Sequence, residues 1–344
     1  MFYFIFCMFL SFVFVFLLAK YAHKLGLLDI PNERSHHCSI IPSGGGIGFM
    51  SAFFFSLFFF ETELFFEYWY VFAAIAMIFA VGVLDDRVDV SPKLKFIVIF
   101  FAVTLLWMFD MSIFSLGNFF GFELSLGFLA LPFTMFALAG FTNALNLIDG
   151  IDGLSSSISI TIIAFFAYIG YEHYNEIMLS ISLASIAVIL GFLFLNWNPA
   201  KIFMGDSGSL SLGFIISVLA LMSLEYLHPV VILYFTALPV LDTLVVMTRR
   251  IRRGHSPLSA DKTHIHHIMV KFFDDNVKKT VAFLILLQLA FSSFGYLLTL
   301  LIRENPNGWI PFFSLINFAI IFILSYMIFT GIKKRQNKID NVDL

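Results

Sequence analysis

The stretch IMLSISLASIAVILGFLFL, residues 177–195, contains no charged side chain and decides the class of fold. A helix rises about 1.5 Å per residue, so about 20 apolar residues span the hydrocarbon core of a bilayer. Across all 344 residues, 60% are hydrophobic and 12% are charged. Soluble globular domains carry about 25% charged residues. The sequence therefore predicts an all-α polytopic membrane protein.

Ten other apolar runs of similar length accompany this stretch, so we expect about eleven membrane crossings. The runs 45–60 and 209–224 are short and rich in Gly or Ser, which leaves ten crossings as an alternative. No linker and no internal repeat divide the sequence, so residues 1–344 are expected to form one integral-membrane domain. The expected crossings are 2–19, 45–60, 68–84, 96–112, 124–141, 156–171, 177–195, 209–224, 229–248, 280–302 and 309–331.

The basic residues set the expected orientation. Threading the chain through a bilayer places 19 of the 20 Lys and Arg residues on one side, which the positive-inside rule assigns to the cytoplasm. The N-terminus is then outside and the C-terminus cytoplasmic. Thirteen of the 14 Asp residues lie on the same side, although the rule concerns only Lys and Arg. We therefore expect the chemistry of the protein at the cytoplasmic face.

The segment VGVLDDRVDVSPKLK, residues 81–95, places Asp85 and Asp86 at the cytoplasmic end of a predicted helix. The helix dipole disfavours anions at that end by about 0.3–1 kcal/mol each, and the adjacent carboxylates repel each other. A cation is expected there, and Mg²⁺ is usually bound by one or two carboxylates plus substrate phosphates. Ser91 and Pro92 have the pattern of the next helix start. A solvated acidic turn is the alternative.

The segment NALNLIDGIDGL, residues 143–154, carries polar side chains at steps of three. Such steps keep side chains on one facet of a helix, so they are expected to face one spot. A calcium loop would need Glu at its twelfth position, where the sequence has Ile160, and is excluded. A helix end with Asx turns is the alternative. The polar residues are Asn143, Asn146, Asp149 and Asp152.

The segment NWNPAKIFMGDSGS, residues 196–209, leads into the expected crossing at 209–224. Asp206 and the small residues after it put a carboxylate and free backbone N–H groups at a helix N-terminus. That arrangement is suited to a phosphate group. An ordinary Asp N-cap is the alternative.

The longest cytoplasmic loop, 249–279, contains the segment PLSADKTHIHH at 257–267. A loop of that length in a compact protein is usually functional or disordered. Its histidines do not share one helical face and no Cys accompanies them, so a zinc site is disfavoured. Contacts to phosphate oxygens or sugar hydroxyls fit better. The histidines concerned are His264, His266 and His267.

Three further features of the sequence are informative. The run Arg249–Arg253 beside a crossing is typical of an anchor to anionic lipid. Asp242 lies within a crossing, where a charge is costly, and is therefore a functional candidate. The segment DIPNERSHHCSIIPSGGGIG, residues 29–48, has glycines that would let a backbone approach a ligand or another helix.

In this order and at these spacings, the segments resemble the polyprenyl-phosphate N-acetylhexosamine-1-phosphate transferase superfamily, glycosyltransferase family 4. The resemblance covers nearly the whole chain, and it is closest to the branch that starts O-antigen and related surface glycans. This family usually has Arg before the glycines, where this sequence has Ser43. The matching segments are PNERSHH…PSGGGIG, LDDRVD, NALNLIDGIDGL, FMGDSGS, LDTLVVMTRR and DKTHIHH.

The resemblance implies transfer of an N-acetylhexosamine 1-phosphate, GlcNAc-1-phosphate first, from a UDP-sugar to undecaprenyl phosphate at the cytoplasmic face. UMP is released, and the product starts a lipid-linked glycan such as a lipopolysaccharide O-antigen. The location implied is the bacterial inner membrane among its lipids, with no nucleic-acid partner. The oligomeric state stays open, a homodimer included, as does the choice between direct displacement and a covalent aspartyl intermediate.

The resemblance also assigns roles. Asp206 and Asp85 are the implied Mg²⁺ ligands, with Mn²⁺ as a substitute, and Asp85 or Asp86 acts on the lipid phosphate. Lys93 and Lys95 neutralise phosphate. The resemblance implies that the nucleotide is bound by Asn146, Asp149 and Asp152, with Asn143 beside them, and that Phe203 stacks on uracil. The diphosphate or sugar is contacted by His264, His266 and His267, with Asp242 nearby.

Two other classes of function predict different patterns. A transporter or flippase would place ionisable groups near mid-bilayer in two matching halves, whereas here the acids gather at one face and no halves repeat. A scaffold for other glycan enzymes would leave the carboxylates of the motifs dispensable.

Overall fold

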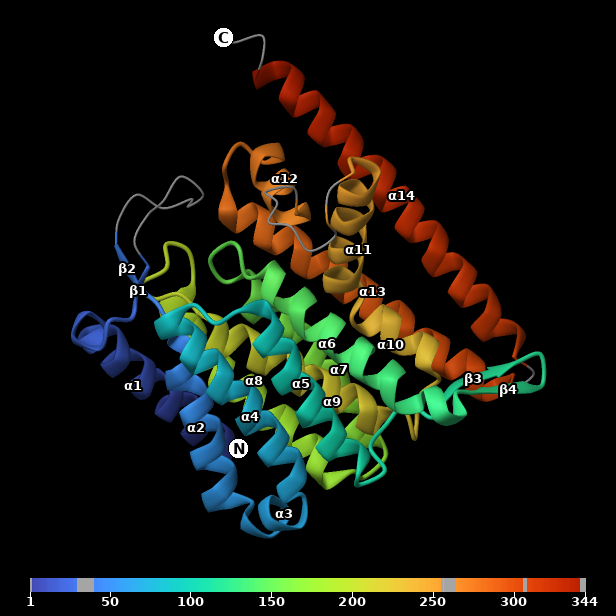
Figure 1. Cartoon of the computed structure of the whole chain (residues 1–344), viewed down its shortest axis with the longest axis horizontal. Coiled ribbons are helices and arrows are strands. Elements are labelled where there is room, and N and C mark those ends of the chain that lie inside the picture. The colour runs from blue at the N-terminus through green and yellow to red at the C-terminus, as the bar shows by residue number, and fades with distance from the viewer. Residues whose placement is uncertain (1, 30–39, 255, 257–263, 306–307, 341–344) are drawn as a thin grey trace. The chain divides into compact units, whose positions relative to one another are not determined.

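The computed structural model describes residues 2–29, 40–254, 256, 264–305 and 308–340 (Figure 1). These residues form helices, with two short two-stranded sheets. The prediction of an all-α polytopic membrane protein is confirmed. Contacts group the chain into two compact units, Met1–Ser115 with Leu126–Tyr226 and Leu116–Ser125 with Leu227–Leu344. No linker in the sequence marks this division, and the single domain stays a prediction.

The first unit is organised around α9 (Asp206–Ser223), which packs against α2, α4, α6 and α7 and is buried along most of its length. The remaining elements of this unit are α1 (Phe2–Leu25), β1 (Leu28–Asp29), β2 (Ile41–Pro42), α2 (Gly45–Phe60), α3 (Thr62–Glu67), α4 (Trp69–Val88), α5 (Pro92–Trp107), a 3₁₀ turn (Gly127–Leu129), α6 (Ala130–Ile148), α7 (Leu154–Glu172) and α8 (Glu176–Asn196).

Glycines allow α2 and α4 to approach the first turn of α9 very closely. A Cβ at Gly46 would lie 2.0 Å from the backbone nitrogen of Gly208, and one at Gly82 would lie 2.5 Å from the Cα of Ser207. No real Cβ tolerates such contacts, so larger residues would push these helices apart. The glycines near residue 45 were expected to allow close approach of a ligand or of another helix, and Gly46 allows the approach of a helix.

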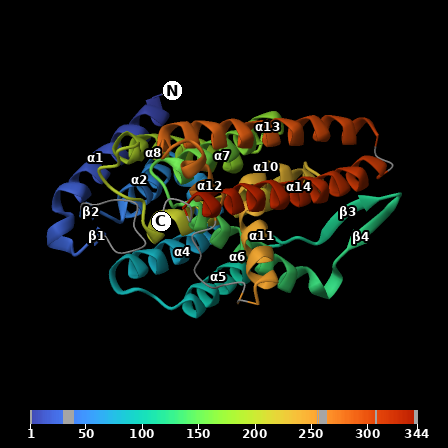
Figure 2. The same cartoon turned by 90° about the horizontal axis from the view of Figure 1, so that it is seen from above.

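The second unit contains the C-terminal helices and a hairpin contributed from between α5 and α6. Its hairpin and the start of α14 lie side by side in both views (Figures 1 and 2), and Phe120 packs edge-on against Trp309 there. The elements are β3 (Ser115–Phe119), β4 (Phe122–Ser125), α10 (Pro229–Phe235), α11 (Ala237–Arg252), α12 (Ile265–Phe272), α13 (Val277–Glu304) and α14 (Trp309–Asp340).

The expected crossing at 229–248 is broken. Helices α10 and α11 meet at an angle of 84°. Backbone groups freed by a break inside a membrane need partners, and Gln288 of α13 supplies them. Its side chain donates to the carbonyl of Phe235 at 2.8 Å and accepts from the N–H of Leu238 at 3.0 Å. Periodicity alone gave no sign of this break, because both halves are apolar.

Each expected crossing coincides with a helix or with the bent pair. Among the described residues, seven helices are long and apolar enough to span a membrane, or eight if the bent pair counts as one span. Helix α2 is a shorter apolar helix. The protein is therefore a multi-pass membrane protein, while the count of eleven crossings and their orientation stay predictions.

The segment 249–279, expected to be a loop, is only partly one. The last turn of α11 occupies its beginning, and α12 forms within it at Ile265–Phe272. Asp242 explains why a helix starts there, because its Oδ1 accepts the N–H of Ile265 at 2.6 Å. Asp242 lies on α11, 23 residues before Ile265, so the sequence did not indicate that it would cap α12.

Candidate active site

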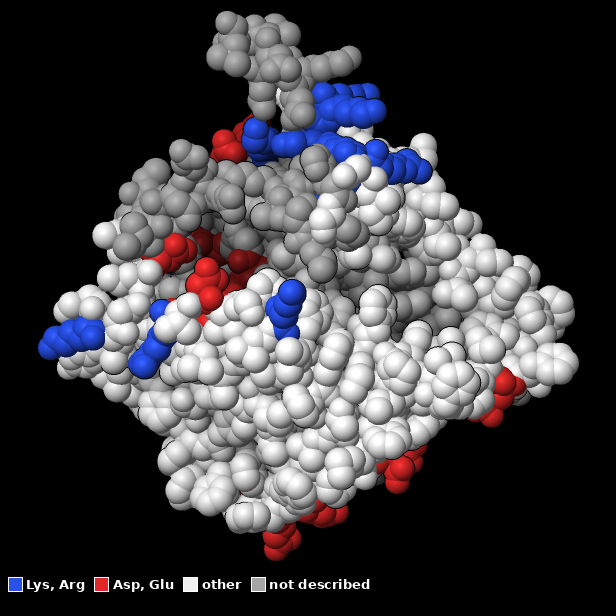
Figure 3. All heavy atoms as spheres, viewed as in Figure 1, with Lys and Arg blue, Asp and Glu red and all other residues white. Residues whose placement is uncertain are grey.

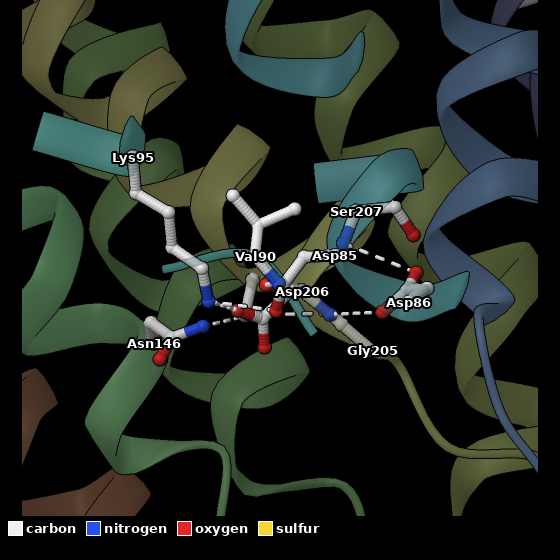
Figure 4. A network of polar contacts seen from close by, with 9 residues as sticks. Asp85, Asp86, Val90, Lys95, Asn146, Gly205, Asp206 and Ser207 are labelled. Atoms are coloured by element: carbon white, nitrogen blue, oxygen red, sulfur yellow. Dashed lines mark hydrogen bonds and ion pairs between the residues drawn. The ribbon is translucent and has the colours of Figure 1, made fainter. Parts of the chain in front are cut away.

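Four helix ends of the first unit meet at one place (Figure 4). Helix α4 packs against α9 and α5, and α6 packs against α9 and α5 as well. Helix α4 ends at Val88, and its C-cap residue Asp89 has φ 49°. Helix α5 begins at Pro92 with Ser91 as its N-cap, as predicted. The ends of these helices bring together polar residues from segments far apart in the sequence.

A lysine lies between two carboxylates at the centre of this place. Lys95 Nζ donates to Asp85 Oδ2 at 2.6 Å and to Asp206 Oδ2 at 2.5 Å. Asp85 Oδ1 accepts the N–H of Val90 at 2.6 Å, which ties the carboxylate to the turn between α4 and α5. The side chains of Lys95, Asp85 and Asp206 are 21%, 11% and 27% exposed. Two carboxylate oxygens from different helices therefore converge on one cationic centre that solvent can reach.

Asp86 has a different environment from its neighbour. Its Oδ1 accepts the N–H of Asp206 at 2.6 Å, and its Oδ2 accepts the N–H of Ser207 at 3.2 Å. Asp86 therefore fixes the first turn of α9 and, with it, the position of Asp206. Its catalytic role stays a prediction.

The start of α9 differs from the sequence expectation. The next two N–H groups, those of Gly208 and Ser209, donate to the carbonyl of Gly205. With Asp206 and Ser207 bound to Asp86, all four N–H groups of the first turn are engaged. The expectation of free N–H groups for a phosphate at this helix end is wrong. The carboxylate of Asp86, which comes from α4, occupies the N-terminus of α9, where the helix dipole favours an anion.

Burial disfavours the charged form of the carboxylates at this site. It raises the pKa of Asp85 to about 6, together with hydrogen bonding to Asp206. Burial also raises the pKa of Asp86 to about 6, although the N–H groups of α9 oppose the shift. For Asp149, burial and the negative charges of Asp206 and Asp86 raise the pKa to about 7. Figure 3 shows acidic side chains gathered in a hollow of the surface. Such a cluster favours binding of a further cation.

The four residues at steps of three do not all serve one purpose. Asn146 donates from Nδ2 to Ser209 Oγ at 2.9 Å, which joins α6 to α9 beside Asp206. Asp152 Oδ2 accepts from Asn198 Nδ2 at 2.8 Å and from the N–H of Ala200 at 3.0 Å. Asp152 therefore holds the turn between α8 and α9. Asn143 lies half-buried on α6, and Asp149 is half-buried just after its end.

Two of the predicted substrate contacts lie in other surroundings. Lys93 is exposed on the first turn of α5, whereas Lys95 on the same turn is part of the network. The backbone of Phe203 accepts the N–H of Gly45 at 2.9 Å and donates to the carbonyl of Pro42 at 2.8 Å. Phe203 thus anchors the glycine segment, and stacking of its ring on uracil stays a prediction.

In the second unit, Asp242 and the histidines form a separate polar group. Asp242 is buried, and its Oδ2 lies 2.8 Å from His264 Nδ1. The rings of His264 and His266 stack at 5.6 Å, and those of His266 and His267 lie 4.1 Å apart. Asp242 thereby orients the first histidine and, through the start of α12, the two that follow. A functional role of Asp242 stays a prediction.

The arginine run does not behave uniformly as a lipid anchor. Arg249 and Arg250 are buried, at 2% and 5% exposure. Arg252 lies over the ring of Tyr326, 4.7 Å from its centroid. Because an anchor must reach lipid head groups, the interpretation as an anchor is wrong for Arg249 and Arg250.

Comparison with known proteins identifies the family of this chain. Residues 68–224 match the model of "Glycosyl transferase family 4". The chain is 32% identical over 93% of its length, and 88% of the relative, to a probable undecaprenyl-phosphate N-acetylglucosaminyl 1-phosphate transferase of Bacillus subtilis. The chain belongs to glycosyl transferase family 4. It is also 32% identical to the undecaprenyl-phosphate alpha-N-acetylglucosaminyl 1-phosphate transferase of Salmonella typhi, over 75% of its length and 73% of the relative. The enzyme of the same name from Yersinia pestis is 34% identical, over 76% of this chain and 74% of the relative.

The residues matched to glycosyl transferase family 4 include the whole network around Lys95, while Asp242 and the histidines follow residue 224. The network suits a hard cation, because oxygen ligands are what Mg²⁺ prefers. In the described part of the chain, no three His, Cys, Asp or Glu side chains are grouped to hold a metal by themselves. Asp85 and Asp206 fit the other arrangement, in which two carboxylates share the ion with substrate phosphates.

Proposed function

We propose that this protein transfers GlcNAc 1-phosphate from UDP-GlcNAc to undecaprenyl phosphate, releasing UMP and starting a lipid-linked surface glycan. We place the reaction at the cytoplasmic face of a bacterial inner membrane. The observation that carries the proposal is the convergence of Asp85 and Asp206 on one cationic centre at the ends of apolar helices. The names of the relatives support undecaprenyl phosphate as the acceptor and GlcNAc 1-phosphate as the transferred group, and the basic side of the sequence supports the cytoplasmic face.

The reaction joins two anions, and this determines what the protein must supply. An oxygen of the lipid phosphate attacks the phosphorus attached to the sugar. The bond from that phosphorus to the bridging oxygen breaks, and UMP leaves with the bonding electrons. The lipid phosphate is already largely ionised at neutral pH, so little proton transfer is needed. Catalysis of phosphoryl transfer then rests on positioning and on neutralising charge. The geometry is compatible with direct displacement and with an aspartyl intermediate.

We further propose that Asp85 and Asp206 hold Mg²⁺, for which Mn²⁺ would substitute. When bound, the ion neutralises the diphosphate and polarises a phosphoryl oxygen. Asp86 would contribute by fixing the N-terminus of α9, and Asn146 by holding α6 against the same turn. Each of these residues therefore acts on the place where Asp206 lies.

The remaining predicted contacts concern the donor. We propose that Asn146, Asp149 and Asp152 bind the nucleotide, with Asn143 beside them. The ring of Phe203 would stack on uracil. The histidines held by Asp242 would contact the diphosphate or the sugar, since neutral or charged imidazoles donate to oxygen.

The test incubates the purified full-length protein with Mg²⁺, undecaprenyl phosphate and a panel of UDP-sugars, and measures UMP and the lipid product. We expect UMP and a lipid diphosphate sugar with UDP-GlcNAc, and loss of both products in EDTA or with Asp206→Asn. A matched control is Asp274→Asn, since Asp274 is an exposed residue after α12. Absence of UMP with every UDP-sugar would contradict the proposed activity, and turnover in EDTA would contradict the metal.

A further inference from the structure

We propose that Lys95 is a built-in competitor of the divalent cation for Asp85 Oδ2 and Asp206 Oδ2, so that the protein by itself binds the metal weakly. This inference rests on the proposed function for the identity of the site. It concerns a role of Lys95 other than contact with substrate phosphate.

The first argument is that the ammonium and a metal ion require the same oxygens. Lys95 Nζ lies 2.6 Å from Asp85 Oδ2 and 2.5 Å from Asp206 Oδ2. The other oxygen of Asp85 is engaged by the N–H of Val90. Both oxygens of Asp86 are engaged by α9. A cation that binds Asp85 and Asp206 together must therefore meet the ammonium.

The second argument is electrostatic. Two cations that contact the same pair of oxygens lie a few ångströms apart and repel each other, more strongly in a partly buried site than in water. Either the ammonium moves away or the metal binds more weakly. Lys95 has a flexible four-carbon stem and remains 21% exposed, so it can move toward solvent. The free energy needed to separate the ammonium from two carboxylates makes the free energy of metal binding less favourable.

The third argument concerns the donor. A sugar nucleotide brings a diphosphate with two negative charges, which is enough to accept both the metal and the displaced ammonium. The metal is then expected to bind well only together with the nucleotide. Lys95 would thus offset part of the negative charge of four nearby carboxylates between turnovers and reduce their mutual repulsion. Those carboxylates are Asp85, Asp86, Asp149 and Asp206.

The experiment measures binding of Mn²⁺ alone to the purified full-length protein, from the electron paramagnetic resonance signal of free Mn²⁺. We expect Lys95→Met to bind Mn²⁺ about tenfold more tightly or better than the wild type, which corresponds to about 1.4 kcal/mol. Lys95→Arg keeps the charge and should bind as weakly as the wild type. Lys278→Met is the matched control, because Lys278 is an exposed lysine on the first turn of α13 with no part in the network, and the affinity for Mn²⁺ should not change.

A second measurement adds UDP, with correction for Mn²⁺ bound to UDP in solution. UDP should strengthen Mn²⁺ binding to the wild type, and less so to Lys95→Met. Lys95→Gln takes the place of the Met variant if that variant does not fold. Equal or weaker Mn²⁺ binding by the neutral variants would overturn the inference, as would an equal effect of UDP. Release of UMP by the wild type is scored separately, so failure of the inference is distinguishable from failure of the proposed function.

Discussion

Substitution of Gly205 by alanine should damage the site without touching a charged residue. Gly205 has φ 73° and ψ 172°, a conformation that only glycine adopts readily. A Cβ there would lie 2.5 Å from Asp86 Oδ1 and 2.8 Å from Asp86 Oδ2. The carboxylate would have to retreat by about 0.9 Å to reach ordinary contact at 3.4 Å. That movement breaks or lengthens its bonds to the N–H groups of Asp206 and Ser207.

The loss of stability in Gly205→Ala has two contributions, backbone strain at residue 205 and weakened hydrogen bonds of Asp86. A forbidden backbone conformation costs about 1–3 kcal/mol. Each hydrogen bond to a charged group contributes about 1.5–3 kcal/mol, part of which water recovers at this half-buried site. We expect the free energy of unfolding to fall by about 2–5 kcal/mol. Misplacement of a reacting group by about 1 Å costs about 10²-fold in rate, so kcat for UMP release should fall by that order.

The assay compares UMP release and melting temperature of Gly205→Ala with those of Gly140→Ala. A Cβ at Gly140 meets nothing within 4 Å, and the residue lies inside α6. Alanine there should be neutral or stabilise by about 0.5–1 kcal/mol. Wild-type turnover and melting temperature in Gly205→Ala would refute the role given to the contact between Asp86 and α9.

Three further predictions follow from other parts of the structure. Because the pKa of Asp149 is raised to about 7, the folded protein holds this proton more tightly than the unfolded chain, so stability declines as pH rises from about 4 to 7. Asp149→Asn should flatten the decline between melting temperatures measured at pH 5 and pH 8, and an unchanged slope would contradict this. Gln288→Leu should lower stability by about 2–4 kcal/mol, because two backbone groups at the break lose their partner; Ser292→Ala, which leaves both bonds in place, should cost less, and equal melting temperatures would refute the argument. In a cysteine-free background, Ser91→Cys should react with a membrane-impermeant thiol reagent only in inverted vesicles and Glu63→Cys only in intact cells, and the reverse labelling would overturn the orientation.

Much of the candidate site was accessible from sequence because its residues violate local preferences. Adjacent carboxylates at a helix end, such as Asp85 and Asp86, are unfavourable without a cation. Asp242 is unfavourable within an apolar run. Such residues can be recognised in the sequence without knowing what they contact. Their partners did not stand out, since Lys95 and Lys93 are equivalent in the sequence and only one of them points into the network.

Apolar length and the spacing of charges were enough to predict a helical membrane protein, the places of most of its long helices and the segments that carry polar chemistry. Apolar length and the spacing of charges are local properties, and a bilayer leaves helices as the way to satisfy the backbone. Tertiary structure alone decided that Asp86 holds the start of α9, that Gln288 holds the break between α10 and α11, and that Asp85 and Asp206 share one lysine. These contacts join residues far apart in the chain, and which partner each polar group finds depends on how closely the glycines let α2, α4 and α9 pack.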